Sequence, residues 1–302
     1  MPKWSDSNSG SVAVVQWCWA RLVQPANGGM MGNRKDMALV ILCPLIASAV
    51  SLFQGLGLLG STFLYFSVPA CWLSFRNRGR VQLLQKIALF AFVLTVPLTI
   101  VIDYILVINE VWHLPSSAFP FRLLGQIAIE QFVWTFSFVY FIILFYEHFF
   151  EVEQDPYFLR KVAYLISFFL IVLLAFFAIL AGRPSLMLFP HTYFWVGLSF
   201  VVAPMFVFLL VVRRFPFRFL PTTLYFLVTA VLFEYVGLHL EQWIFTGRGI
   251  LYSFSFFGQL LPLEELVCWW FLAPCTVLAL YKFPIAGLHR TLPLLHRPSS
   301  IG

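Results

Sequence analysis

Charged residues are scarce in this chain of 302 residues. Asp, Glu, Lys and Arg make up only 11% of it and hydrophobic residues 61%, whereas a soluble globular domain carries roughly 25% charged residues. This shortage excludes an ordinary soluble domain and predicts a polytopic membrane protein. Lys and Arg outnumber Asp and Glu by 19 to 13. In a membrane protein such an excess marks cytoplasmic loops, so no nucleic-acid partner is expected.

The residue patterns of common cofactor sites are also missing. The five cysteines are odd in number and form no CxxC pair, so we predict no disulfide framework and no cysteine metal site. The six histidines form no HxxxH pair, and no DDxxD motif for a magnesium-bound diphosphate is present. No glycine-rich phosphate loop follows a predicted strand. We therefore expect no cofactor: no metal, and no flavin or nicotinamide as a stoichiometric reactant.

Long apolar runs, in contrast, are abundant. A spanning helix needs about 20 mainly apolar residues. Eight such runs predict an all-α fold of about eight transmembrane helices, at 37–54, 57–75, 87–108, 123–146, 162–181, 191–212, 219–240 and 258–281. The glycine cluster QGLGLLG (54–60) predicts a tight turn between the first two. Residues 1–36 read as a polar N-terminal tail and residues 286–302 as a cytoplasmic tail.

The basic residues predict an orientation. With the N-terminus inside, sixteen of the 19 Lys and Arg residues fall in cytoplasmic segments. Only Arg122, Arg183 and Arg248 fall in outside loops. This asymmetry follows the positive-inside rule. It predicts an integral protein of a bacterial-type inner (cytoplasmic) membrane with both termini cytoplasmic.

An internal repeat carries the polar residues. DYILVINEVW (103–112) matches EYVGLHLEQW (234–243), since both read acid-Tyr, five residues, Glu, one residue, Trp. Downstream, FRLLGQIAIEQFVW (121–134) resembles FSFFGQLLPLEELVCW (254–269). Such self-similarity suits parallel repeats with an even number of spans. The predicted domains are two parallel four-helix repeats, at residues 37–160 and 161–285.

Most acidic residues lie in these motifs. A charged carboxylate at mid-bilayer costs about 2.5–3.5 kcal/mol, whereas desolvation raises the pKa of a carboxyl group and leaves a neutral acid that can hold or donate a proton. The duplicated set therefore favours a function for the acids. The alternatives are hydrogen bonds between helices or wet headgroups. Seven of the thirteen acids belong to the set: Asp103, Glu110, Glu130, Glu234, Glu241, Glu264 and Glu265.

Aromatic residues surround the acids. An interfacial belt accounts for about half of such residues. The others would face a cavity in which ring faces attract a carbocation by roughly 0.5–2 kcal/mol per contact. Acids and aromatic faces in an apolar pocket are what a proton-initiated polyene cyclisation needs. The flanking residues are Trp112, Trp134, Trp243, Trp269 and Trp270, with Tyr104 and Tyr235 beside the leading acids.

The second repeat resembles the lycopene cyclase domain of the membrane-integral, heterodimer-type carotenoid cyclases of bacteria, archaea and fungi. The resemblance lies in LPLEEL (261–266) with the aromatic residues after it, and in Glu234, Trp243 and Gly258 upstream. That family is built from two such domains, fused or as separate subunits. The resemblance implies that a carboxylic acid protonates a terminal double bond of lycopene, a six-membered ring closes, and a proton is lost.

The resemblance also implies site residues. Glu264 and Glu265 match the two acids of the PxEE motif and Glu234 the upstream acid, with Asp103 and Glu130 as their first-repeat partners. We expect proton donation mainly from the second repeat. The expected substrate-binding residues are Trp112, Trp243, Tyr104, Tyr235, Trp269 and Trp270.

The first repeat departs from the family pattern. Ala128 stands where the motif has proline, and Gln131 stands at the place of the second acid. This leaves room for a different substrate, one-sided cyclisation or lost activity. Two alternatives to a cyclase therefore stay open: a membrane carrier or transporter of lipid or protons, and a degenerate structural partner of a cyclase.

The expected partners are a hydrophobic polyene in the bilayer, the lipid membrane and other carotenoid-pathway enzymes.

Overall fold

The computed structural model describes residues 30–150, 157–212 and 217–282. The chain divides into two compact units, residues 1–38 and residues 39–302. Of the first unit, only the beginning of helix α2 (Met30–Gln54) is described. The predicted N-terminal tail up to residue 29 and the predicted cytoplasmic tail at 286–302 lie outside the described residues.

Helices separated by short strands make up the first half of the chain. The second helical span is continuous but contains a π-helical segment, η1, in its middle. In chain order the elements are α2, α3 (Leu58–Thr62), η1 (Phe63–Ser67), α4 (Val68–Arg76), α5 (Val81–Ile108), β1 (Trp112–His113), β2 (Arg122–Leu123), β3 (Ile127–Ala128) and α6 (Ile129–Phe149).

The second half repeats this order of elements. Its second span again contains a π-helical segment, η3, and its last helix begins with another, η5. The elements are α7 (Phe158–Gly182), η2 (Pro184–Met187), α8 (Thr192–Gly197), η3 (Leu198–Val202), α9 (Ala203–Val212), η4 (Phe217–Phe219), α10 (Leu220–His239), β4 (Ile244–Phe245), β5 (Ser253–Phe256), β6 (Gln259–Pro262), η5 (Glu265–Leu272) and α11 (Ala273–Tyr281).

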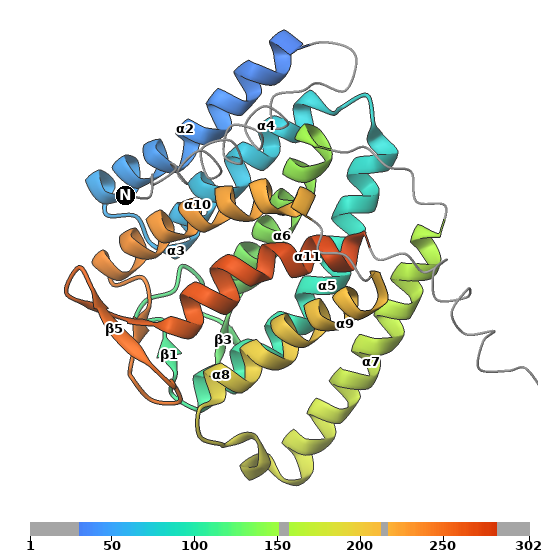
Figure 1. Ribbon diagram of the computed structural model, residues 1–302. Helices are drawn as coiled ribbons and strands as arrows, with labels where there is room; N and C mark the ends of the chain where they lie inside the picture. Colours follow the sequence, from blue (N-terminus) through green and yellow to red (C-terminus); the bar gives the residue numbers. More distant parts are fainter. Residues whose placement is uncertain (1–29, 151–156, 213–216, 283–302) are drawn as a thin grey trace, which may run out of the picture. The chain divides into compact units, whose positions relative to one another are not determined.

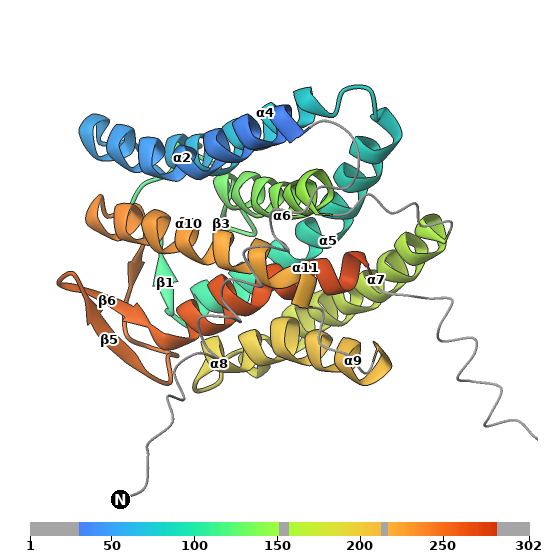
Figure 2. The same ribbon diagram turned by 45° about the horizontal axis from the view of Figure 1, so that its top comes forward.

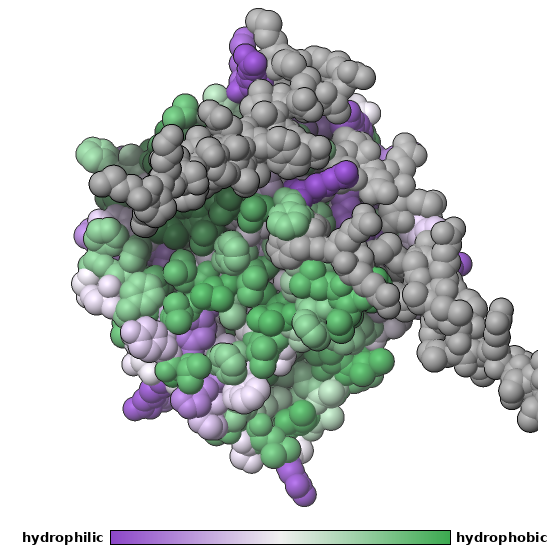
Figure 3. All heavy atoms as spheres, viewed as in Figure 1, coloured by the Kyte–Doolittle hydropathy of each residue, from purple (hydrophilic) through white to green (hydrophobic). Residues whose placement is uncertain are grey.

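The helices have the length and composition of membrane spans. Within the described residues, seven helices are long and apolar enough to cross a membrane, and the helix at Glu265–Tyr281 is a shorter apolar one. Helix α7 exposes most of its apolar side chains, and hydrophobic residues dominate the face in Figure 3. Exposed apolar surface on this scale suits lipid rather than water. The prediction of an all-α polytopic membrane protein is confirmed.

Two predicted spans begin later than expected. Helix α6 begins at Ile129 rather than at 123, and the helical backbone of the last span begins at 263 rather than at 258. The residues before each helix form hairpins, β2–β3 and β5–β6. Both central residues of each turn have positive φ: 53° and 73° at Leu124 and Gly125, 49° and 85° at Phe257 and Gly258. Such two-residue turns match the twist of paired strands.

The predicted glycine turn between the first two spans is confirmed. Helix α2 ends at Gln54 and α3 begins at Leu58, with Gly55 at φ +60°. GLGLLG (55–60) also has the glycine spacing of a dinucleotide-binding loop. It connects two helices rather than a strand and a helix, so it lacks the context in which that spacing binds a pyrophosphate.

The two sequence repeats meet at a short pair of strands. Strand β1 pairs antiparallel with β4, and His113 lies opposite Ile244. These two residues are 131 apart, the same separation as Asp103 and Glu234 at the start of the repeated motif. Glu110 and Glu241, also 131 apart, both have positive φ, 53° and 52°. Equivalent positions facing each other indicate an approximate two-fold relation between the repeats.

Helix α6 lies at the centre of the helices of the second unit. It packs against α4, α5, α10 and α11, as Figures 1 and 2 show. The ring of Phe138 on α6 lies 5.4 Å from Phe66 and 5.7 Å from Phe226, near perpendicular to both. Edge-to-face contacts of this kind add to the gain from burying aromatic area. Strands β1, β3 and β5 gather at one end of these helices (Figures 1 and 2).

Candidate functional site

A cavity of about 170 Å³ lies among α5, α6, α8, η3, α10, η5 and α11, beside the end that carries the strands. Most of its lining residues are apolar or aromatic. An apolar cavity of about 150 Å³ engineered into another protein holds benzene. The cavity of this protein therefore has room for a six-membered ring or for the end of a longer apolar molecule.

Three carboxylic acids line the cavity. Asp103 on α5, Glu234 on α10 and Glu265 at the start of η5 are only 6%, 2% and 6% exposed. Asp103 and Glu234 occupy equivalent positions of the two repeats. Gln131 on α6 lines the cavity at the position equivalent to Glu265. Both repeats thus contribute carboxyl or amide groups to one cavity, whose other lining residues are mostly apolar or aromatic with four threonines among them.

The hydrogen bonding of the equivalent acids differs. The indole Nε1 of Trp243 donates to Oε1 of Glu234 at 2.9 Å. Oδ2 of Asp103 is buried and, among the described residues, has no hydrogen-bond partner. Buried polar atoms without a partner are rare in native structures and need an explanation, which a functional role can give. The two equivalent acids therefore have different surroundings, because the carboxyl group of Glu234 has an indole donor and Oδ2 of Asp103 has none.

Two predicted catalytic acids lie outside the cavity lining and hold loops instead. Glu264 accepts a hydrogen bond from the backbone N–H of Leu251. Glu130 accepts from the backbone N–H of Ala118 and from the hydroxyl of Ser117, the latter at 2.8 Å. Ala118 and Leu251 are 133 apart, so the two repeats use the same loop anchor. In each pair of adjacent polar residues, the first binds a loop and the second faces the cavity.

Four of the six predicted substrate-binding residues line the cavity: Trp112, Trp243, Trp269 and Trp270. The two tyrosines do not. Tyr104 packs its ring against Phe176 at 5.4 Å. Tyr235 stacks on His239 at 5.9 Å and contacts Phe257 at 5.0 Å. The tyrosines beside the leading acids therefore belong to the packing of the outer helix faces.

Other lining residues were not predicted as site residues. Trp134 on α6 contacts Trp270 at 6.1 Å, near perpendicular, and its position beside the acid motif was the available signal. Phe138 and Phe233 also line the cavity. Tyr193, whose ring stacks on Trp269 at 6.0 Å, comes from α8. No sequence motif marks α8, so its contribution depends on how the helices pack.

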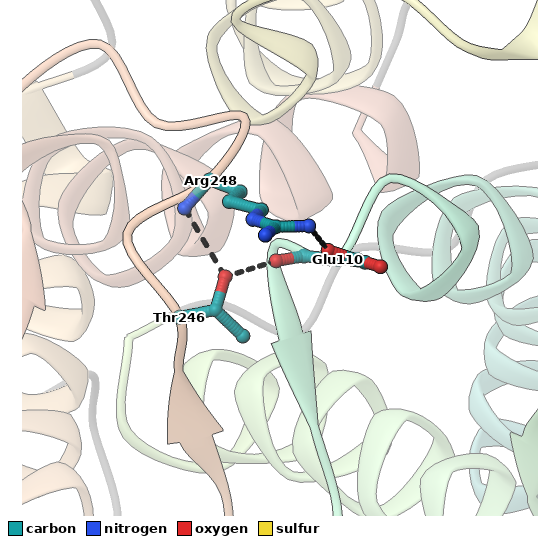
Figure 4. Close-up of polar contacts among 3 residues, drawn as sticks. All are labelled: Glu110, Thr246 and Arg248. Carbon is teal, nitrogen blue, oxygen red and sulfur yellow. Dashed lines mark hydrogen bonds and ion pairs between the residues drawn. The ribbon is translucent and has the colours of Figure 1, made fainter.

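Contacts between the two repeats join strands β1 and β4 beside the cavity. Trp112 on β1 and Phe245 on β4 face each other in the strand pair and both line the cavity. The hydroxyl of Thr246 donates to the backbone carbonyl of Glu110, and the guanidinium of Arg248 pairs with the Glu110 carboxylate. Figure 4 shows these contacts. The β1–β4 pair is thereby held in place from both repeats.

Comparisons with protein-family models, with curated proteins and with solved structures found no match. Within the described residues, no group of three or more His, Cys, Asp or Glu side chains is arranged to hold a metal ion. Three buried carboxyl groups can hold or transfer protons, and five indole rings can face a cationic or π-rich ligand.

Proposed function

We propose that this protein is a membrane-integral cyclase that isomerises lycopene or a related isoprenoid polyene by acid catalysis. The observation that supports it is one ring-sized apolar cavity in which Asp103, Glu234 and Glu265 meet the tryptophans. The resemblance of LPLEEL (261–266) to the lycopene cyclase motif gives the substrate class.

In the proposed reaction, a neutral carboxyl group of the cavity gives its proton to a terminal double bond of the polyene. The electron pair of the neighbouring double bond then forms the ring bond, and a carboxylate takes a proton from a carbon beside the cation. No electrons are gained or lost overall. General acid–base catalysis by one positioned group contributes typically 10²–10⁴-fold, and burial favours the neutral acid that the first step requires.

The aromatic wall suits the cationic intermediate. Trp112, Trp134, Trp243, Trp269 and Trp270 all line the cavity. The face of an indole ring attracts a cation by about 0.5–2 kcal/mol, more where water is excluded. Indole rings also cannot supply the oxygen nucleophile that would trap the cation as an alcohol. The tryptophans therefore stabilise the cation without trapping it, which favours proton loss and a cyclic alkene.

Glu264 and Glu130 receive a different role in this proposal. Their carboxylates hold the loops at Leu251 and Ala118, so they support the cavity and do not transfer the proton. The acids assigned to the chemistry are Glu234, Glu265 and Asp103. Gln131 occupies the position of the first repeat that is equivalent to Glu265. Its amide group can donate or accept hydrogen bonds but cannot transfer a proton as an acid.

The proposal is tested by expressing the protein in a bacterial host that accumulates lycopene. The expected result is a product of unchanged mass with one or two rings. Glu234→Gln should abolish detectable product at equal protein level, and Glu241→Gln, at an exposed acid of the same repeated motif, should not. Lycopene that copurifies but stays unchanged would instead support the carrier alternative. Folded protein that neither converts nor binds lycopene would contradict the proposed substrate.

A further inference from the structure

The indole of Trp243 fills a space that only glycine leaves open. Gly237 lies buried in the last turns of α10. A Cβ atom at this position would lie 2.0 Å from Cη2 and 2.3 Å from Cζ2 of Trp243. Those distances are far inside van der Waals contact, so any larger residue must push the indole away. Glycine destabilises a helix interior relative to alanine. Its presence here is therefore best explained by the space that the indole needs.

The indole in this space holds the Glu234 carboxyl group. Its Nε1–H donates to Oε1 at 2.9 Å, and its ring lies against Phe233 at 5.1 Å. Trp243 is only 8% exposed, so the indole has little freedom to turn. Because Oε1 accepts this bond, a neutral Glu234 carries its proton on Oε2. The backbone contact of Gln242 N–H with the Gly237 carbonyl, at 2.8 Å, fixes the turn that brings Trp243 back over α10.

The first repeat lacks this arrangement. The residue 131 positions before Gly237 is Leu106, just as Asp103 precedes Glu234 and Trp112 precedes Trp243. Leu106 is buried and lines the cavity, so the first repeat has a large side chain at the position where the second repeat has a glycine. In the described part of the chain, Trp112 makes no hydrogen bond with Asp103, and Oδ2 of Asp103 is without a partner.

We infer that Gly237 and Trp243 are positioning residues that make Glu234, rather than Asp103, the proton donor of the cavity. The inference rests on the proposed function and deepens it by naming the donor. In the step, the Oε2–H bond of Glu234 breaks as its proton forms a C–H bond at the terminal alkene. The neighbouring π pair closes the ring. The Glu234 carboxylate, stabilised by the indole N–H, then takes back a proton from a carbon beside the cation.

The test compares Trp243→Phe, Gly237→Ala and the double variant in purified protein reconstituted in lipid. Trp243→Phe keeps an aromatic ring but removes the donor, and Gly237→Ala displaces the donor. Each should lower kcat roughly tenfold, the value of one lost hydrogen bond, with KM nearly unchanged and with an altered pH profile of kcat. The double variant should be no worse than either single one, because both remove the same contact. Multiplying effects, or full activity of Trp243→Phe, would overturn the inference.

A matched control and a second readout keep the inference separate from the proposed function. Gly182→Ala, at the end of α7, introduces a Cβ into open space and should change nothing. The infrared C=O stretch of the neutral Glu234 acid is identified as the band that disappears in Glu234→Gln. This band should move in Trp243→Phe and in Gly237→Ala, whether or not lycopene is converted. If the band moves in the two variants but the unaltered protein does not convert lycopene, the positioning role is supported and the proposed substrate is contradicted. Conversion with an unmoved band contradicts the positioning role.

Discussion

Adjacent polar residues of this protein have divided tasks. Glu264 reaches the backbone of Leu251, whereas the next residue, Glu265, lines the cavity. Glu130 and Gln131 divide in the same way in the first repeat. A helix turns by about 100° per residue, so neighbouring side chains necessarily face different surroundings. The pair of glutamates in the motif is therefore one loop anchor followed by one cavity acid.

This division predicts different outcomes for two neighbouring substitutions. Glu265→Gln should lower the rate of ring formation by about 10²-fold or more, because it removes a buried carboxyl group that can give or take a proton in the cavity. Glu264→Gln should keep activity within a few-fold, since the amide oxygen of glutamine can still accept the Leu251 N–H. Product formed per folded protein measures both.

Glu264→Leu serves as the comparison for the anchor. It removes the acceptor and should lower the thermal stability of the protein, while Glu264→Gln should not. Equal loss of activity in Glu264→Gln and Glu265→Gln would show that both carboxylates act in the chemistry, as the sequence motif alone predicts.

The sequence identified the neighbourhood of the cavity but not the direction of each side chain. Asp103, Glu234 and Glu265 line it as their spacing suggested, whereas Tyr104 and Tyr235 do not. The heptad spacing of Asp103 and Glu110 indicated a shared helix face, but α5 ends at Ile108 and Glu110 lies in the turn with positive φ. Where a helix ends depends on tertiary contacts that composition does not reveal.

At the scale of elements, η5 sets the geometry of the last span. Its eight residues, Glu265–Leu272, are π-helical and contain Glu265, Trp269 and Trp270, all of which line the cavity. A π-helical segment holds more residues per turn than an α-helix and often occurs at functional sites. If this segment were α-helical, the three side chains would point in different directions around the helix axis.

Deletion of Val267 tests that role. This residue of η5 is 42% exposed, so its loss removes little core packing. One residue fewer would favour an α-helical backbone and turn Glu265 by about 100° relative to Trp270. We expect the variant to insert into the membrane but to lose ring formation at least 10²-fold. Activity close to that of the unaltered protein would show that the π-helical register is not needed. Val267→Ala, which keeps the register, is the control.

The hairpins before α6 and η5 were not predicted, for a physical reason. Their sequences, such as FSFFGQLLP (254–262), are as apolar as the helices that follow. A short apolar run does not distinguish a strand from the start of a buried helix. The signal that was present is the glycine of each turn, Gly125 and Gly258, which follows Leu124 or Phe257 in a two-residue hairpin turn.

At the scale of the molecule, two repeats related by an approximate two-fold axis line one cavity, but the side chains that they contribute differ. Repeated motifs and apolar runs predicted the helices and their order, because both signals are local. The pairing of β1 with β4 and the entry of Tyr193 from α8 depend on contacts distant in sequence. Glu234 with its indole donor and Asp103 without one make the halves chemically different.

The orientation in the membrane is a prediction for the whole chain. Sixteen of the 19 basic residues fall on the side assigned to the cytoplasm. In a background without the five native cysteines, single cysteines introduced at 115–119 and 246–252 should react with an impermeant reagent added from outside. Cysteines at 213–218 should not react in intact cells but should do so after lysis. Labelling of cysteines at 213–218 from outside intact cells would contradict the predicted orientation.

The central claim is that a carboxyl proton starts ring formation, and solvent deuterium tests it most directly. Carboxyl protons exchange with solvent, so the purified protein in lipid is first equilibrated in D₂O and kept in excess over lycopene. Each reaction then starts from a deuterated carboxyl group, and the product is examined by mass spectrometry. The account predicts one carbon-bound deuterium gained for each ring, with no product from Glu234→Gln. Cyclic product without incorporated deuterium, or equal product from Glu234→Gln, would contradict it.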